Sequence, residues 1–116
     1  MLAKAFLNKG PAILLAWMAG ILIVAPAGEE MVFRGAIHSY LSARIGSRTA
    51  IFVAALLFVL IHVPQLDGYW PAMLGIFGLG VVAGVARELT GSLLGAVLVH
   101  VAYNSVTMAS VLAGRS

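Results

Sequence analysis

The 116-residue sequence contains no cysteine, and only 9% of its residues carry a charge. Without cysteine the chain has no disulfide, no thiolate nucleophile and no cysteine-ligated metal. So few charged residues could not cover the surface of a water-soluble fold of this size. The net charge of +3 is spread along the chain without a basic run, so we expect no nucleic-acid partner.

Hydrophobic residues make up 62% of the sequence. This composition predicts an all-α integral membrane protein. The sequence has no repeats, no low-complexity segments and no long linker, so we expect residues 1–116 to form a single transmembrane domain. The short, simple chain favours a prokaryotic source, and the expected location is the cytoplasmic membrane of a prokaryote.

The apolar segments predict a bundle of about five transmembrane helices, over residues 1–27, 28–44, 49–63, 71–89 and 91–112. Pro26 and Gly28 indicate a break between the first two helices, and Pro71 indicates the start of the fourth. Several segments are shorter than the roughly 20 residues that cross a bilayer, which favours tilting or local thinning. The spacings Gly80-x-x-x-Gly84 and Gly91-x-x-x-Gly95 indicate close helix packing.

Residues 1–27 also resemble a signal peptide, because basic residues precede an apolar run that ends in Ala25-Pro26-Ala27. Further membrane segments follow, so we favour a first span that is retained in the protein. Whether residues 1–27 are retained stays open.

Five spans would place the basic residues Lys4, Lys9, Arg44, Arg48 and Arg87 on one side of the membrane, and Asp67 on the other. The same topology brings five polar side chains into one half of the bundle, which is where we expect a buried polar active site: Glu29, Glu30, His62, His100 and Asn104. The charges are too few to decide which face of the membrane this half occupies.

The most informative segment is Glu29-Glu30-x-x-x-Arg34. Ionisable residues at membrane depth are costly and are found mainly at functional sites. On a helix Glu30 and Arg34 lie four residues apart on one face, in the favourable orientation for an ion pair. Glu29 lies about a hundred degrees round the helix. We therefore expect Arg34 to pair with Glu30 and to leave Glu29 for chemistry.

Three other polar residues admit two interpretations each. His62 could bond backbone carbonyls near a helix end, and His100 and Asn104 could form interhelical polar contacts. Together with Glu29 they predict hydrolysis: a carboxylate beside an imidazole can activate water, and an imidazole and an amide on one helix face can stabilise an oxyanion.

Three motifs occur in order: Glu29-Glu30-x-x-x-Arg34, Phe58-x-x-x-His62 and His100-x-x-x-Asn104. They resemble the motifs of the CPBP family (CAAX protease and bacteriocin-processing, also called Abi), which includes the Ras-converting prenyl-protein endoprotease. The resemblance covers residues 25–110 approximately. The chain is shorter than better-known relatives, which have more helices, and we therefore include homo-oligomerisation among its expected associations.

The resemblance implies a glutamate-dependent, metal-independent intramembrane endopeptidase without a cofactor. It assigns water activation to Glu29 and His62, and support of that site to Glu30 and Arg34. It assigns the oxyanion hole to His100 and Asn104. The implied substrate is a peptide bond near the C-terminus of a membrane-associated protein, either prenylated or a bacteriocin-like peptide, and membrane lipid is an implied partner.

Three alternatives stay open at this point. A zinc-dependent protease would use Glu29, His62 and His100 as ligands, although the His-Glu-x-x-His pattern is missing. A non-catalytic immunity or scaffold protein of the same family would bind a partner in the membrane. A serine protease would use Ser92 or Ser105, but the sequence lacks the Gly-x-Ser-x-Gly order.

Overall fold

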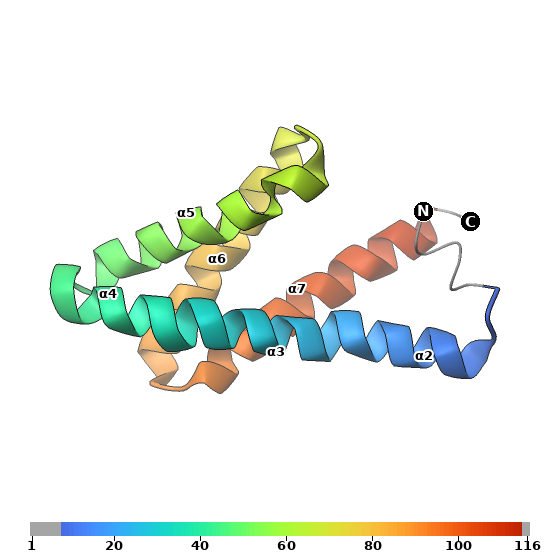
Figure 1. Ribbon diagram of the computed structural model, residues 1–116, viewed down its shortest axis with the longest axis horizontal. Coiled ribbons are helices and arrows are strands. Elements are labelled where there is room, and N and C mark those ends of the chain that lie inside the picture. Colours follow the sequence, from blue (N-terminus) through green and yellow to red (C-terminus); the bar gives the residue numbers. More distant parts are fainter. Residues whose placement is uncertain (1–7, 115–116) are drawn as a thin grey trace.

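The computed structural model describes residues 8–114 (Figure 1). All regular elements in this range are helical, which confirms the predicted all-α class: α2 (Pro11–Ala19), η1 (Gly20–Val24), α3 (Ala25–Glu30), η2 (Met31–Ile37), α4 (His38–Ile45), α5 (Ser47–Leu66), α6 (Trp70–Thr90) and α7 (Leu93–Ala113). The segments η1 and η2 are π-helical turns. Lys4 lies outside the described residues.

The elements α2 to α4 form one continuous helix of 35 residues, Pro11–Ile45. With α5, α6 and α7 it gives four helices that are long and apolar enough to cross a membrane within residues 8–114. The predicted membrane class is confirmed, with four spans here in place of about five. The long helix exceeds the roughly 20 residues that a bilayer requires, so it must tilt or extend beyond the hydrocarbon region.

The predicted break at Pro26 and Gly28 is wrong, and the π-helical turn η1 explains why. A proline inside an α-helix lacks an N–H and clashes with the preceding turn. Just before Pro26, the N–H of Ala25 donates to the carbonyl of Gly20, five residues back. The wider turn lets the chain accommodate the proline without ending the helix. The first two predicted spans are therefore one.

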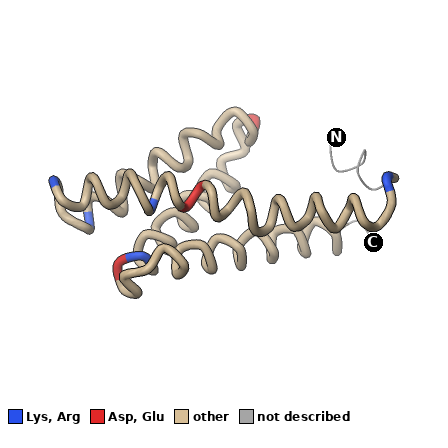
Figure 2. Tube along the Cα trace, turned by 60° about the horizontal axis from the view of Figure 1, so that its bottom comes forward, with Lys and Arg blue, Asp and Glu red and all other residues tan. Residues whose placement is uncertain are grey.

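This continuity changes the predicted topology. Lys9 precedes the long helix and Arg44 lies near its other end, so these two basic residues lie at opposite ends and not on one side as predicted. Arg44, Arg48 and Arg87 do share one end, as predicted, because the α4–α5 and α6–α7 turns lie together there (Figures 1 and 2). Asp67, in the α5–α6 turn, lies at the opposite end.

Small residues bring α5 and α6 into close contact. A Cβ atom on Gly80 would lie 2.9 Å from the Cβ of Ala55, and one on Gly84 would lie 3.1 Å from the Cγ2 of Ile51. This confirms the predicted packing role of the Gly80–Gly84 pair. The second predicted pair is wrong, because Gly91 has φ +65° and lies in the turn before α7.

The large side chains of the buried apolar core in the described residues are Phe33, Phe58 and Leu79, contributed by η2, α5 and α6. The rings of Phe33 and Phe58 meet edge to face with centroids 5.2 Å apart. This core joins the long helix to the α5–α6 hairpin. α7 crosses the middle of the long helix, and its C-terminal half diverges from the hairpin (Figure 1). The crossing places side chains of the long helix opposite those of α7.

Candidate active site

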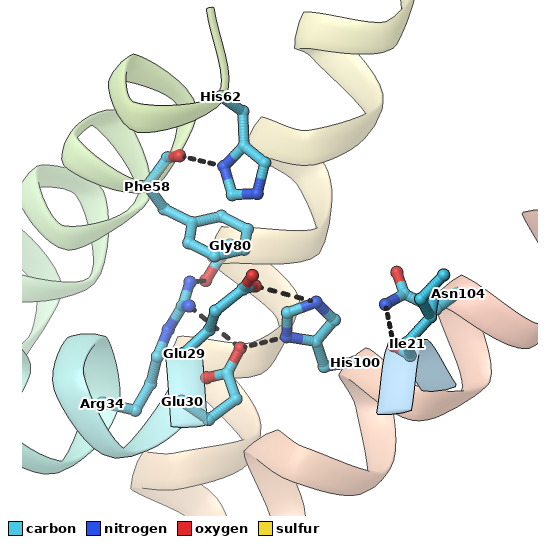
Figure 3. Close-up of polar contacts among 9 residues, drawn as sticks. All are labelled: Ile21, Glu29, Glu30, Arg34, Phe58, His62, Gly80, His100 and Asn104. Carbon is cyan, nitrogen blue, oxygen red and sulfur yellow. Dashed lines mark hydrogen bonds and ion pairs between the residues drawn. The ribbon is translucent and has the colours of Figure 1, made fainter. Parts of the chain in front are cut away.

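Four side chains meet where the long helix, α6 and α7 approach one another: Glu29, Glu30, Arg34 and His100 (Figure 3). We call them the central quartet. Glu29 and Glu30 end the short segment α3, between the two π-helical turns, and Arg34 lies within the second of these turns. Single π-helical turns inside α-helices occur frequently at functional sites, where they change the direction of the side chains.

Arg34 holds the quartet to α6. Its Nη1 donates to Oε1 of Glu30 at 3.1 Å, and both side chains are fully buried. Its Nη2 donates to the backbone carbonyl of Gly80 at 2.6 Å. The predicted pairing of Arg34 with Glu30 is confirmed. The Gly80 carbonyl was not predicted, and the absence of a side chain at Gly80 is what lets the guanidinium come this close.

His100 connects both glutamates. Its Nδ1 lies 2.8 Å from Oε1 of Glu30, and its Nε2 lies 3.5 Å from Oε2 of Glu29. A neutral imidazole donates from one nitrogen, whereas a protonated one donates from both. One nitrogen of the ring therefore faces each glutamate, and His100 links the two carboxylates across the contact between the long helix and α7.

The two glutamates have different surroundings. Glu30 is fully buried and bonded to both Arg34 and His100, whereas the side chain of Glu29 is 34% exposed. Glu29 makes its ion-pair contact with His100 and none with Arg34 in the described chain. This agrees with the prediction that Arg34 pairs with Glu30 and not with Glu29; the role of Glu29 in chemistry stays a prediction. Glu29 is therefore the carboxylate of the quartet that a water molecule can reach.

The ring of Phe58 forms one wall of the quartet. It is 1% exposed, and the guanidinium carbon of Arg34 lies 4.9 Å from its centroid. His100 meets the ring edge to face with centroids 5.5 Å apart, and His62 lies 4.6 Å away. The sequence did not lead us to expect that the Phe58 ring would contact Arg34 and both histidines. The i, i+4 spacing of Phe58 and His62 was the available signal.

His62 lies beyond the Phe58 ring, half-buried, and is separated by it from the quartet (Figure 3). Its Nδ1 is 2.6 Å from the carbonyl oxygen of Phe58. This is the carbonyl contact that the sequence offered as the alternative interpretation of His62. No hydrogen bond or ion pair joins His62 to Glu29 or Glu30 within the described part of the chain.

Asn104 lies one turn after His100 on α7, beside the quartet and not in contact with it (Figure 3). Its Nδ2 donates to the backbone carbonyl of Ile21, in η1, at 3.5 Å. A hydrogen bond of this length is weak. The side-chain amide is therefore easily available to another acceptor. The structure brings four of the six predicted site residues into direct contact and places His62 and Asn104 at the edges.

The donor set considered for zinc was Glu29, His62 and His100. Among residues 8–114, no group of three or more His, Cys, Asp or Glu side chains is arranged so that it could hold a metal ion. Glu29 and His100 lie together, while His62 is directed to the carbonyl of Phe58.

A family model described as "Type II CAAX prenyl endopeptidase Rce1-like" matches residues 11–106, a range that includes all six predicted site residues. The chain belongs to this family. The match confirms the resemblance drawn from the three motifs, and it places this Rce1-like protein, at the family level, among the CAAX-type membrane proteases, a family that acts on prenylated proteins. Searches for similar curated proteins and for similar solved structures found no match.

Proposed function

We propose that this Rce1-like protein hydrolyses a peptide bond near the C-terminus of a membrane-associated, prenylated protein, with water activated by Glu29. The family supports the class of reaction and of substrate. The observation that carries the proposal is the difference between the two glutamates. Glu30 is buried with Arg34, and Glu29 is accessible with its Oε2 3.5 Å from His100.

In the proposed reaction, Glu29 takes a proton from water as the hydroxyl oxygen attacks the scissile carbonyl carbon. The carbonyl oxygen becomes an oxyanion. When the intermediate collapses, the carbon–nitrogen bond breaks and Glu29 returns the proton to the leaving amine. Glu30 and Arg34 hold His100 and do not touch the reacting atoms.

The imidazoles of His62 and His100 and the side-chain amide of Asn104 complete the proposed site. Because Nδ1 of His62 faces the carbonyl of Phe58, Nε2 is the ring nitrogen left for the attacking water. His100 and Asn104 lie one turn apart on the same face of α7 and supply the oxyanion donors, with Nε2 of His100 exchanging its 3.5 Å contact with Glu29 for the oxyanion. Removing one such donor typically lowers kcat by about 10²–10³-fold. We therefore expect a loss of this size for Asn104→Ala, whose present bond to Ile21 is weak.

We propose no metal and no cofactor for this reaction. The alternatives of a zinc-dependent protease, a bacteriocin-like substrate and a non-catalytic scaffold are distinguished by the experiment below. Homo-oligomerisation and a prokaryotic cytoplasmic membrane stay predictions.

The test compares the wild-type protein and Glu29→Gln, both purified in detergent, on a farnesylated CAAX peptide and on the same peptide without the lipid. We expect the wild type to cleave the prenylated peptide, with a chelator having no effect. We expect Glu29→Gln to lose activity by about 10²–10⁴-fold, the usual contribution of a general base.

Other outcomes overturn specific parts of the proposal. Loss of cleavage with a chelator, restored by zinc, would establish the metal-dependent alternative. Equal cleavage of the unprenylated peptide would contradict the substrate class. A folded wild-type protein that cleaves neither peptide, nor bacteriocin-like peptides, would indicate the scaffold function.

A further inference from the structure

A second polar cluster lies at the far end of the long helix, outside the candidate active site. It surrounds an open pocket of about 360 Å³ between α4 and the end of α6, and we call it the end pocket. Its lining residues are His38, Ser39, Ser42, Ala43, Arg87 and Glu88. The volume falls within the about 300–1,000 Å³ typical of small-molecule sites. The proposed hydrolysis uses none of these residues.

Glu88 is fixed at one side of the end pocket. Its Oε1 lies 2.6 Å from Nε2 of His38 and accepts a longer bond from the hydroxyl of Ser42, at 3.5 Å. His38 is only 2% exposed, and its Nδ1 is buried without a hydrogen-bond partner in the described residues. The Glu88 side chain is 38% exposed. Both contacts use one carboxylate oxygen, so the other oxygen remains for a ligand.

Arg87 supplies a positive charge to the end pocket, opposite in sign to that of Glu88. Its guanidinium makes no ion pair with any residue from 8 to 114, and its Nε is buried without a hydrogen-bond partner there. Leaving a buried donor unpaired costs about 1–3 kcal/mol, more for a charged group. The pocket therefore presents an unpaired cation beside an anchored carboxylate, together with serine hydroxyls.

The end pocket lies where lipid headgroups are expected. It is at the end of the bundle that carries Arg44 and Arg48, opposite Asp67 (Figure 2). Basic residues concentrate at one membrane surface, and basic pockets between transmembrane helices bind lipid headgroups. Apolar side chains cover the helices toward the middle of the bundle, as contact with acyl chains requires.

We propose that the end pocket binds the phosphoethanolamine headgroup of a membrane phospholipid. Arg87 pairs with the phosphate, as guanidinium groups do in forked, charge-assisted contacts. Glu88 accepts hydrogen bonds from the primary ammonium. A purely anionic headgroup would place its charge against Glu88, and a choline headgroup has no N–H to donate. The two opposite charges thus select a headgroup that carries both a phosphate and an ammonium.

The experiment measures thermal unfolding of the full chain in detergent supplemented with phosphatidylethanolamine, phosphatidylcholine or phosphatidylglycerol with identical acyl chains. Each variant is compared with itself in phosphatidylcholine, so a general loss of stability cancels. We expect the ethanolamine lipid to raise the unfolding temperature most. We expect Arg87→Gln and Glu88→Gln each to weaken the apparent affinity by about tenfold. The control Arg44→Gln, a basic residue near the same end, leaves it unchanged.

Three results would overturn the proposal. Equal shifts with all three lipids would show no headgroup site. A preference for phosphatidylglycerol that only Arg87→Gln removes would show a site for anionic lipid. Stabilisation by soluble O-phosphoethanolamine without any effect of the ethanolamine lipid would place the ligand in solution and not in the membrane. These outcomes do not depend on proteolytic activity, so they are independent of the proposed reaction.

Discussion

The protein contains two histidine–carboxylate contacts of similar length in very different surroundings. Nδ1 of His100 lies 2.8 Å from Glu30 in the central quartet, and Nε2 of His38 lies 2.6 Å from Glu88 in the end pocket. Glu30 is fully buried, whereas the Glu88 side chain is 38% exposed. The distances alone would suggest equal contributions to stability.

Burial makes the difference. Removing one partner of a buried ion pair typically costs about 3–5 kcal/mol because the remaining charge has no compensation. In the end pocket only His38 is buried; the Glu88 carboxylate is 38% exposed, so water solvates its charge and removing that charge costs much less. The quartet is therefore a structural element as well as a candidate catalytic one, whereas removing the charge of Glu88 from the end pocket costs the fold little.

The largest effect on stability is expected from Arg34→Met, which removes the cation of the quartet. Glu30 would then be buried with His100 alone, and the free energy of unfolding should fall by about 3–5 kcal/mol. Arg44→Met is the matched control, because Arg44 is exposed and stacks on Tyr40 at 3.6 Å; we expect about 0.5–1 kcal/mol. Equal losses in thermal or denaturant unfolding in detergent would contradict the comparison.

A smaller loss is expected from Gly80→Ala. The new methyl group would lie 2.9 Å from the Cβ of Ala55 and 3.0 Å from Nη2 of Arg34, so it would push α5 and the guanidinium away. Overpacking of this kind costs about 1–3 kcal/mol. Gly78→Ala, two residues earlier on the same helix, meets no atom within 4 Å and should be neutral or slightly stabilising. Unfolding of both variants under identical conditions checks the difference.

The smallest effect is expected from Glu88→Gln in the end pocket. It keeps the shape of the side chain and an oxygen that can still face the buried His38, and it removes only the charge of the partly exposed Glu88, so the free energy of unfolding should change by about 0–1 kcal/mol. A loss as large as that of Arg34→Met would show that the two histidine–carboxylate contacts are equivalent after all. The measurement is made in phosphatidylcholine, so that lipid selectivity does not contribute.

The sequence predicted those parts of the site that depend on local spacing. Glu30 and Arg34 pair because positions four apart share one face of a helix. The close approach at Gly80 and Gly84 follows from the same periodicity and from residue size. The helix start at Pro71 is also local, because a proline in the first turn sacrifices no intrahelical hydrogen bond.

The errors arose where the backbone departs from ideal geometry or where distant segments meet. Pro26 normally interrupts a helix, and no residue pattern in the sequence indicates that a π-helical turn would absorb it. That error also placed Lys9 on the wrong side. The carbonyl of Gly80 is a backbone group whose role depends on tertiary contact with Arg34, so residue identities could not reveal it. The sequence did predict that His100 and the two glutamates converge, but which nitrogen faces which carboxylate depends on tertiary contact in the same way.

The most direct test of the account compares Glu29→Gln with Glu30→Gln, measuring cleavage of a prenylated peptide and unfolding of the same preparations. The two substitutions are chemically identical and adjacent in sequence. We expect Glu29→Gln to unfold like the wild type and to lose cleavage by about 10²–10⁴-fold. We expect Glu30→Gln to lower the free energy of unfolding by about 3–5 kcal/mol, because Arg34 is left without its carboxylate. A Glu29→Gln protein that still cleaves at the wild-type rate would contradict the account.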